Sequence, residues 1–188
     1  MESSSGAEKL LLGAPRRGRP RMTTARKLRL VTVFLVLAGT VGCDQTSKHI
    51  ARTKLGARGS ITLPGGFGEL RLAENPGSFL GLGSALSPGL RRIVFTLGVG
   101  AGLITLLVWL VGRARLNWLS FFGFALAVAG GTSNLIDRVT QQGLVTDFIF
   151  LQVGPLHTGV FNVADILIMF GLVMVAGALW KRQPTAEP

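Results

Sequence analysis

Charged residues and metal-binding side chains are scarce in this sequence. The single cysteine, Cys43, excludes a disulfide scaffold, and one cysteine with two histidines excludes a Cys/His zinc cluster. Charged residues make up 15% of the 188 residues, against about one quarter in typical soluble domains. Apolar residues make up 48% and the mean hydropathy is +0.47, so extensive disorder is excluded as well. The composition therefore predicts a small membrane protein.

Basic residues outnumber acidic ones and gather near the amino terminus. The net charge is +11, and eight of the 20 basic residues precede residue 30. No aromatic residue lies among these eight, so the segment lacks a platform on which bases could stack. A basic cluster before an apolar run is instead typical of the cytoplasmic flank of a membrane helix. We therefore expect no nucleic-acid partner, and a basic disordered tail over residues 1–27.

Four apolar runs organise the rest of the chain. Three of them have 19 to 21 residues, close to the about 20 that cross a bilayer as a helix. The first run, Leu30–Cys43, has 14 residues, and it crosses only if Arg29 snorkels and the polar segment from Asp44 to Lys48 continues the helix. The expected spans are about 29–47, 92–112, 116–136 and 160–180. Small residues in the runs would let the helices pack closely (Gly98, Gly100, Gly102, Gly171 and Gly177).

Basic residues in the short segments orient these spans. With four spans, three basic groups fall on one side: the amino-terminal tail, the Arg113/Arg115 turn and the Lys181/Arg182 end. The positive-inside rule makes that side the cytoplasm, with both termini inside. Arg91 and Arg92 begin the second span on the opposite side and do not fit the rule.

The two outer connections read as strands. Apolar residues alternate with polar ones between glycine and proline in the first connection, and the second has a similar apolar stretch (61–63, 69–72 and 144–150). We therefore expect a small sheet outside the membrane.

Three of the nine acidic residues lie at or near the outer ends of spans: Asp137, Asp147 and Asp165. Ionisable groups at membrane depth are costly, which makes them functional candidates. The cost is highest for Asp165, which lies about five residues inside the fourth apolar run. For any single Asp, the structural alternative is a helix-end carboxylate paired with Arg138.

The spacing of these acids indicates an acid–base site. Asn134 precedes Asp137 by three residues and Asn162 precedes Asp165 by three, so each pair shares a helix face, and the two polar patches can meet between the third and fourth helices. Two carboxyls in a partly desolvated site share a proton, because ionising both at once is unfavourable. In aspartic proteolysis, an ionised Asp activates water while a protonated Asp donates to the scissile carbonyl. Spacing alone favours Asp137 with Asp165 as the pair.

Other catalytic groups are poorly supplied. His49 and His157 lie in different outer segments, and no serine lies in a nucleophile-elbow pattern. We therefore expect neither a serine nor a metal mechanism. Cys43 has no evident histidine partner and is expected to be a small buried apolar residue.

Five short blocks of the chain resemble lipoprotein signal peptidase, also called signal peptidase II. In order, they are Asp44–Lys48, Asn75–Phe79, Gly130–Arg138, Val145–Phe148 and Phe161–Asp165. The resemblance covers the chain from about Arg29 to Trp180. It implies a mainly α-helical membrane enzyme with four transmembrane helices, a small extracytoplasmic β-cradle and an arm. The peptidase domain would span residues 28–182, with a cytoplasmic tail at 183–188.

The activity that the resemblance implies is an aspartic endopeptidase of the bacterial plasma membrane. Such an enzyme removes the signal peptide from diacylglyceryl-modified prolipoproteins, cutting on the N-terminal side of the lipidated cysteine. It uses no cofactor or metal, and its partners are these substrates and membrane lipid, with no obligate protein partner. Its active site lies at the extracytoplasmic face.

The resemblance also implies roles for particular residues. It makes Asp147 and Asp165 the catalytic pair, so the choice of Asp147 rests on resemblance and not on spacing. Asn162 would orient the pair, and the other residues would brace the site or line and hold the substrate region (Asp44, Lys48, Asn75, Gly77, Asn134, Asp137, Arg138 and Ala164). One departure from the family concerns the stretch between Arg138 and Asp147, which is one residue longer than usual and could shift Asp147.

Two other interpretations come from different classes of protein. Thr40–Cys43 at the end of the first apolar run resembles a lipobox, which would make the chain a lipoprotein and hence a substrate. However, Thr40 stands where an aliphatic residue is expected, and a released lipoprotein would not carry three further spans. A non-enzymatic four-span membrane assembly or transport subunit fits the spans equally well, but it does not explain why both Asn–Asp pairs lie at outer helix ends.

Overall fold

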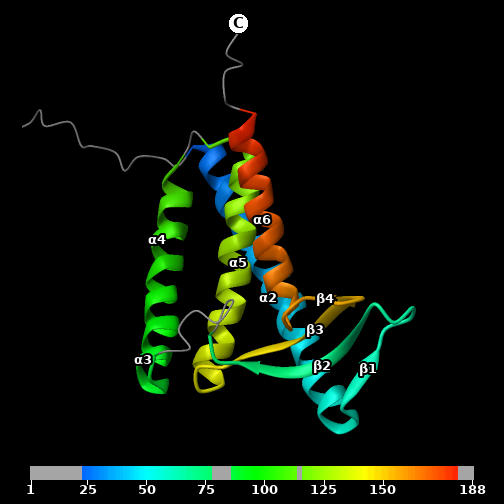
Figure 1. Cartoon of the computed structure of the whole chain (residues 1–188). Helices are drawn as coiled ribbons and strands as arrows, with labels where there is room; N and C mark the ends of the chain where they lie inside the picture. Colours follow the sequence, from blue (N-terminus) through cyan, green and yellow to red (C-terminus); the bar gives the residue numbers. More distant parts are fainter. Residues whose placement is uncertain (1–22, 78–85, 114–115, 182–188) are drawn as a thin grey trace, which may run out of the picture.

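Four long helical stretches run side by side, and a small sheet projects from one end of their bundle (Figure 1). The computed structural model describes residues 23–77, 86–113 and 116–181. Within these residues, four stretches are long and apolar enough to cross a membrane: Thr24–Ala57, Pro88–Gly112, Trp118–Thr140 and Val163–Trp180. The predicted class, a mainly helical four-span membrane protein with a small sheet, is therefore confirmed.

The first stretch is one uninterrupted helix, α2 (Thr24–Arg58). Thr23 caps its start by accepting a hydrogen bond from the Arg26 N–H, and Gly59 ends it with a positive φ of 81°. The polar segment after Cys43 thus continues the helix, as crossing required. Cys43 itself is exposed on the helix and not buried as expected. Because α2 starts at Thr24, the last residues of the expected tail are helical, whereas residues 1–22 and 182–188 lie outside the described residues.

Arg29 is buried inside the bundle and does not snorkel outward. Its side chain is 8% exposed, and its guanidinium donates to the backbone carbonyls of Arg113 and Leu116. The guanidinium also lies 4.9 Å from the centre of the Phe121 ring. Since the carbonyls beyond a helix end lack intrahelical partners, Arg29 uses them to tie the turn between the second and third spans to α2.

The second stretch is built from three consecutive pieces. They are α3 (Pro88–Ile93), a π-helical turn η1 (Val94–Gly98) and α4 (Val99–Gly112). Ser87 caps α3 by accepting from the Leu90 N–H, and Pro88 occupies the first helical position. The stretch packs mainly against α5 (Trp118–Thr140), whereas most of its other side chains face outward.

Helix α5 lies in the centre of the bundle and is packed most closely on α6 (Val163–Trp180). Gly123 faces Gly171 so closely that a Cβ atom on Gly123 would lie 2.5 Å from the Gly171 carbonyl oxygen. The small-residue packing predicted for Gly171 is confirmed. Gly100 lies against Leu135, whereas Gly98, Gly102 and Gly177 have no such neighbour within 4 Å.

The sheet has the strand order β1-β2-β3-β4, with neighbouring strands antiparallel. Its strands are β1 (Ser60–Thr62), β2 (Gly68–Asn75), β3 (Val145–Val153) and β4 (Leu156–His157). The three predicted strand segments are thereby confirmed. In the register of β2 and β3, Asn75 lies opposite Val145 and Ala73 opposite Asp147, which brings the end of β2 beside the start of β3.

The start of α6 differs from the expected span. Phe161 exchanges backbone hydrogen bonds with Ile149 and extends the sheet, so the helix begins only at Val163. Asp165 is therefore in the first turn of α6 and not five residues inside an apolar helix. Helix α5 also runs beyond its expected end to Thr140, which keeps Asp137 within regular helix.

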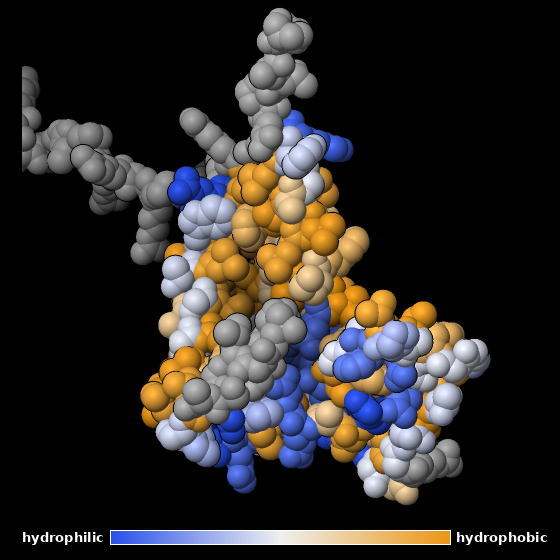
Figure 2. All heavy atoms as spheres, in the orientation of Figure 1, coloured by the Kyte–Doolittle hydropathy of each residue, from blue (hydrophilic) through white to orange (hydrophobic). Residues whose placement is uncertain are grey.

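Apolar side chains face outward along the helices, and charged ones are buried where helices and sheet meet. Figure 2 shows the apolar band along the bundle and the hydrophilic residues gathered at its sheet end. Phe34, Ile104 and Val173 are each more than 60% exposed, whereas Lys48 and Asp137 are completely buried. Exposed apolar faces of this extent suit a lipid environment. The buried charges mark the place where chemistry is to be sought.

Candidate active site

Asn162 joins two carboxyl groups that come from different elements. Its side-chain amide donates to Asp147 Oδ1 on β3 at 2.7 Å, and its backbone N–H donates to Asp165 Oδ2 on α6 at 3.1 Å. Asn162 is completely buried and directly precedes α6. One residue thus holds both carboxyls at the junction of the sheet with the helices.

The Asn162 side chain also caps α6. Its Oδ1 accepts the Asp165 N–H at 3.0 Å, while Asp165 accepts the Asn162 N–H in return. This reciprocal arrangement is a capping box, and it satisfies backbone donors that the first helical turn leaves unpaired. An acidic side chain in the first turn also interacts favourably with the helix dipole. Local helix chemistry therefore explains why a carboxyl is tolerated at this depth.

Asp147 is held from both sides by amide groups. Its Oδ2 accepts a hydrogen bond from Asn75 Nδ2 at 3.0 Å, opposite the contact with Asn162, and its side chain is only 2% exposed. The pKa of Asp147 is raised to about 6, first by burial and then by the neighbouring Asp165 carboxyl, and the two amides and Lys48 partly oppose the rise. Asp147 can therefore hold or release a proton near neutral pH.

Asn134 brings α5 to the same place. Its Nδ2 donates to Asp165 Oδ1 at 2.8 Å, and its Oδ1 accepts from Asn162 Nδ2 at 3.1 Å. The predicted meeting of polar patches from the third and fourth helices is thus observed for Asn134, Asn162 and Asp165. All of the contacts between them are made by amide groups, which donate and accept without adding charge.

Asp137 does not join these carboxyls. It is completely buried and faces α2, where its carboxylate lies 3.1 Å from Lys48 Nζ and 3.2 Å from an Arg52 amino group. It also accepts from Gln45 at 3.0 Å and from the Thr146 N–H at 3.0 Å. The pairing with Asp165 that spacing alone favoured is therefore not seen. Three residues along a helix rotate a side chain by about 300°, so Asp137 points about 60° away from Asn134.

Arg138 is not the partner of Asp137 either. Within the described residues, the ion pairs of Asp137 are with Lys48 and Arg52, and none joins it to Arg138. The Arg138 guanidinium instead lies 5.9 Å from the centre of the Phe95 ring. The structural alternative of an Asp137–Arg138 pair is thus replaced by a pair between helices.

Lys48 is the centre of a buried cluster behind the carboxyl pair. Its ammonium contacts Asp44 Oδ2 at 2.7 Å, Asn134 Oδ1 at 2.8 Å and Asp137 Oδ2 at 3.1 Å. An ammonium has three donors, so all of them are used. With Asp44 and Asp137 opposite Lys48 and Arg52, the cluster is neutral by itself. Among the ion pairs in the described part of the chain, none includes Asp147 or Asp165.

Asp44 fastens three helices together. Its Oδ1 accepts the Ala164 N–H of α6 at 2.9 Å, and its Oδ2 accepts the Ser133 hydroxyl of α5 at 2.7 Å. Asp44 and Lys48 are both completely buried. Of the two roles expected for them, they can thus hold the site in place, but they do not line it.

Gly77 supports the site through Asn75. Its N–H donates to Asn75 Oδ1 at 3.0 Å, which leaves the Asn75 amide nitrogen directed at Asp147. Gly77 has a φ of +107°, and a Cβ atom there would lie 2.8 Å from the Phe95 ring. A glycine is therefore required by both conformation and space. Residues 78 and 79 of the same block lie outside the described residues.

No individual role was predicted from the sequence for four residues of the buried network: Gln45, Arg52, Ser133 and Thr146. Arg52 donates to Thr146 Oγ1 at 2.9 Å as well as to Asp137. A signal for it existed, because Asp44, Lys48 and Arg52 follow one another at intervals of four and so form one stripe on α2. The other three lie inside the blocks that carry the resemblance, Asp44–Lys48, Gly130–Arg138 and Val145–Phe148, but no role was predicted for them.

The stretch between Arg138 and Asp147, where one residue more than in the family was expected, ends in a tight turn. Gln142 has a φ of +56° and Gly143 a φ of +95°, and the chain enters β3 only at Val145. Asp147 still reaches both Asn75 and Asn162. The stretch therefore leaves Asp147 within reach of both amides.

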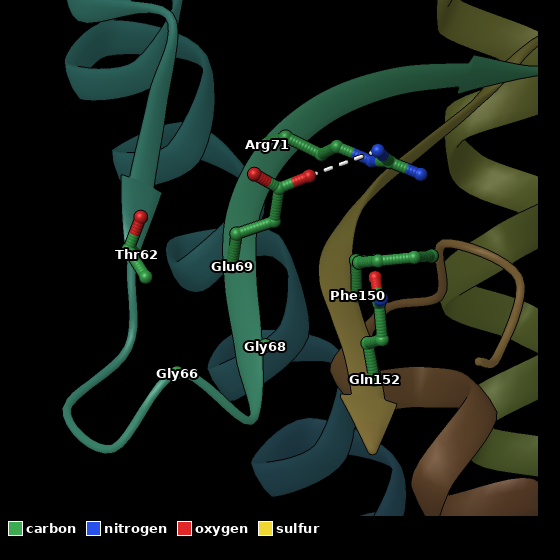
Figure 3. A pocket seen from close by; sticks show the side chains of 7 residues that line it. All are labelled: Thr62, Gly66, Gly68, Glu69, Arg71, Phe150 and Gln152. Carbon is green, nitrogen blue, oxygen red and sulfur yellow. Dashed lines mark hydrogen bonds and ion pairs between the residues drawn. The ribbon is translucent and has the colours of Figure 1, made fainter. Parts of the chain in front are cut away.

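A separate open hollow of about 250 Å³ lies on the sheet (Figure 3). The Arg71 guanidinium lies over the Phe150 ring at 3.9 Å and pairs with Glu69 at 2.8 Å. None of the residues that line this hollow belongs to the predicted site. Across the described ranges, no group of three His, Cys, Asp or Glu side chains could hold a metal ion.

Comparison with known families agrees with the resemblance of the five blocks. The family model described as signal peptidase (SPase) II matches residues 35–181. A lipoprotein signal peptidase from Desulforapulum autotrophicum is 36% identical over 146 residues, covering 77% of this chain and 89% of the relative. One from Moorella thermoacetica is 34% identical over 153 residues, covering 78% of this chain and 91% of the relative.

Solved structures show the same fold. One bacterial membrane enzyme is similar with a TM-score of 0.70 at 27% identity, over 81% of this chain and 94% of that protein. A second has a TM-score of 0.67 at 26% identity, over 84% of this chain and 94% of that protein. The similarity thus includes the helices and the sheet together, and it favours a peptidase over a non-enzymatic membrane subunit or a lipoprotein.

Proposed function

The chain belongs to the signal peptidase II family and removes signal peptides from prolipoproteins, and we propose that Asp147 and Asp165 are its catalytic pair. The enzyme would act as an aspartic endopeptidase on diacylglyceryl-modified substrates, cutting on the N-terminal side of the lipidated cysteine. The observation that carries the residue assignment is the double contact of Asn162, which donates to one carboxyl through its side chain and to the other through its backbone.

The chemistry follows from two carboxyls that share one proton. The ionised carboxylate takes a proton from water as the water oxygen attacks the scissile carbonyl carbon. The protonated carboxyl donates to the carbonyl oxygen, and the tetrahedral intermediate then breaks the C–N bond as the departing amine receives a proton. The raised pKa of Asp147, caused first by burial, supports the retention of that proton near neutral pH.

The other predicted residues would act by positioning. Asn75 and Asn134 each donate to one carboxyl, and Lys48 fixes Asn134 from behind. Because amide donors stabilise carboxylates without neutralising them, these residues would hold the geometry and leave the shared proton free to move. Arg138 has no hydrogen-bond partner for its Nε among the described residues, and we assign it to the wall of the site beside Phe95.

The protein is a multi-pass bacterial membrane protein, and we place both termini in the cytoplasm. The basic residues Arg26, Lys27 and Lys181 lie at the bundle end opposite the sheet, which supports this orientation. The carboxyl pair would then lie at the extracytoplasmic surface. A lipidated cysteine in the outer leaflet would bring its scissile bond to that level, with its acyl chains against the exposed apolar helix faces.

The test is a gel-shift cleavage assay with a diacylglyceryl-modified prolipoprotein. We expect the unmodified enzyme to remove the signal peptide, and Asp147→Asn or Asp165→Asn to slow cleavage by about 1,000-fold or more. Glu74→Gln is the matched control, because Glu74 is an exposed acid on β2 next to Asn75. It should keep full activity.

Each variant must be folded and inserted in the membrane for this comparison. Retained cleavage by a purified, folded Asp147→Asn or Asp165→Asn protein would remove that residue from the pair. A prolipoprotein without the diacylglyceryl group serves as the substrate control. Equal cleavage of both substrates would contradict the proposed recognition of lipid.

A further inference from the structure

Arg91 and Arg92 lie at the sheet end of the bundle, where the positive-inside rule disfavours them. They lie in the last turn of α3, the first piece of a stretch that can cross the membrane from Pro88 onward. Three or four residues of helix rise only about 5 Å, so both arginines are at the level of the headgroups. Within the described part of the chain, no ion pair includes either arginine. Arg91 is half-buried and Arg92 is exposed, so both guanidinium groups are accessible to an anionic ligand at this level.

The two arginines line an open pocket of about 200 Å³. The pocket lies between α3 and the turn before β3, and its walls are Pro76, Pro88, Arg91, Arg92, Gln142, Gly143 and Leu144. Figure 2 shows hydrophilic residues at this end of the bundle, below the apolar band of the helices. None of the wall residues is acidic, so the charge of the pocket is that of the arginines.

The turn opposite α3 is shaped to bring these groups together. A Cβ atom on Gly143 would lie 3.0 Å from Arg92 Cγ and 3.2 Å from its Nε, so the Arg92 side chain lies across this glycine. Gln142 has a φ of +56° and is the one non-glycine residue with positive φ in the described chain. Such a conformation is costly for a glutamine and is often found at binding sites. It places Gln142 in the pocket wall beside the arginines.

The helix that carries the arginines is also lipid-facing. Ile93 is 56% exposed and Leu97 is 68% exposed, both directly beyond the pocket on the same stretch. A ligand with an anionic head in the pocket could therefore lay apolar chains along this helix. The combination favours a phospholipid over a free anion.

We propose that Arg91, Arg92 and Gln142 bind the phosphate of an anionic phospholipid in the outer leaflet. Arginine forks suit phosphate oxygens, and the glutamine amide adds a neutral donor. Pro76 in the pocket wall directly follows Asn75, which contacts Asp147, so a lipid bound here lies beside the catalytic pair. The assignment of a leaflet rests on the orientation proposed above.

The test measures lipid binding to the purified full chain by native mass spectrometry. The probes are dioleoylphosphatidylglycerol, dioleoylphosphatidylcholine and inorganic phosphate. We expect phosphatidylglycerol to bind about tenfold more tightly than phosphatidylcholine, and Arg91→Gln/Arg92→Gln to lose about tenfold of that affinity. The single variant Arg92→Gln should lose about threefold. Lys54→Gln, which removes one exposed charge from α2 outside the pocket, should stay within about twofold of the unmodified protein.

Three results would overturn the proposal. They are unchanged affinity in the arginine variants, equal binding of the two phospholipids, and displacement of phosphatidylglycerol by inorganic phosphate at equal concentration. If the double variant does not fold, Arg92→Gln decides alone. The measurement needs no cleavage, and Asp147→Asn should bind lipid normally, so failure here and failure of the catalytic assignment are distinguishable.

Discussion

At the scale of single residues, the site depends on amides that do two tasks at once. Asn162 caps α6 through its Oδ1 and holds Asp147 through its Nδ2, and Asn134 connects Lys48 to Asp165 in the same manner. An aspartate at either position would lose the donor and add a third charge. The amide is therefore the side chain that the arrangement needs.

The raised pKa of Asp147 makes stability depend on pH. Because the folded-state pKa of about 6 lies above the ordinary value of 3.8, the folded protein binds this proton more strongly than the unfolded chain. The resulting stability is fully present below about pH 4 and is lost as the pH rises through about 6. Asp147→Asn should thus unfold at a higher temperature than the unmodified protein at about pH 8, by an increment worth about 1 to 3 kcal/mol.

This increment is measurable in detergent by tryptophan fluorescence on heating, and it should vanish at about pH 4. The stability increment is smaller than the pKa difference alone would give, because an asparagine has one acceptor oxygen for the two donors Asn75 and Asn162. Glu74→Gln, which removes an exposed carboxyl, is the control and should give no such crossover. If Asp147→Asn raised the unfolding temperature more at low pH than at high pH, the pKa of Asp147 would not be raised in the folded protein.

Asp137 is expected to matter for folding more than for chemistry. Asp137→Asn removes the ion pair of the half-buried Arg52 and leaves Lys48 with Asp44 alone, and breaking a buried ion pair such as Lys48–Asp137 costs about 3 to 5 kcal/mol. We expect lower accumulation in the membrane, with residual activity in whatever protein folds. Immunoblotting measures the amount of protein in the membrane and the cleavage assay measures its activity, so the effects on folding and on chemistry can be separated. An Asp137→Asn protein that accumulates normally but is inactive would give this residue a direct role.

At the scale of elements, the packing of α5 on α6 positions one member of the proposed catalytic pair. Asn134 on α5 reaches Asp165 on α6 because the helices approach closely at Gly130, where a Cβ atom would lie 2.6 Å from the Ala164 carbonyl oxygen. Any separation of these helices would lengthen the hydrogen bond between Asn134 and Asp165. Small residues in this interface therefore serve the chemistry as well as the fold.

Gly130→Ala tests this dependence. The added methyl group would clash with Ala164 and with Ile168, so we expect a loss of about 1 to 3 kcal/mol in stability and a fall in cleavage rate of about tenfold or more. The matched control is Gly98→Ala, because Gly98 has no neighbouring atom within 4 Å at its Cβ position. Thermal unfolding and the cleavage assay are the measurements. Equal behaviour of the two variants would mean that α5 and α6 tolerate separation.

At the scale of the whole molecule, charge and apolar surface are divided between two regions. The bundle presents apolar side chains outward along its length, and the sheet projects from one end (Figures 1 and 2). The carboxyl pair lies at the boundary between them, on β3 and the first turn of α6. With the proposed catalytic pair at this boundary, we expect the enzyme to meet its lipidated substrate at the membrane surface.

The orientation of this layout is testable by cysteine labelling. After Cys43→Ser removes the exposed native thiol, we expect Thr62→Cys on β1 to react with an impermeant maleimide in intact spheroplasts. Lys181→Cys, at the opposite end, should react only after the membrane is opened. The reverse pattern would place the sheet in the cytoplasm and would contradict the proposed location of the active site.

The features that depend on local composition could be predicted from the amino-acid sequence. Apolar runs predict the spans because about 20 helical residues are needed to cross a bilayer, and alternation predicts the strands because successive side chains of a strand point to opposite faces. The pairing of Asn with Asp three residues later indicates acid–base chemistry, and resemblance of the blocks selects Asp147. The contacts between distant residues were visible only in the folded protein. Asp137 contacts Lys48 on α2, and Asp44 contacts Ala164, 120 residues further along the chain. Phe161 pairs with the sheet, so α6 begins only at Val163 and Asp165 lies in its first turn. Such contacts depend on how helices rotate and pack against one another, and side-chain spacing along one helix does not determine which neighbour each polar residue faces.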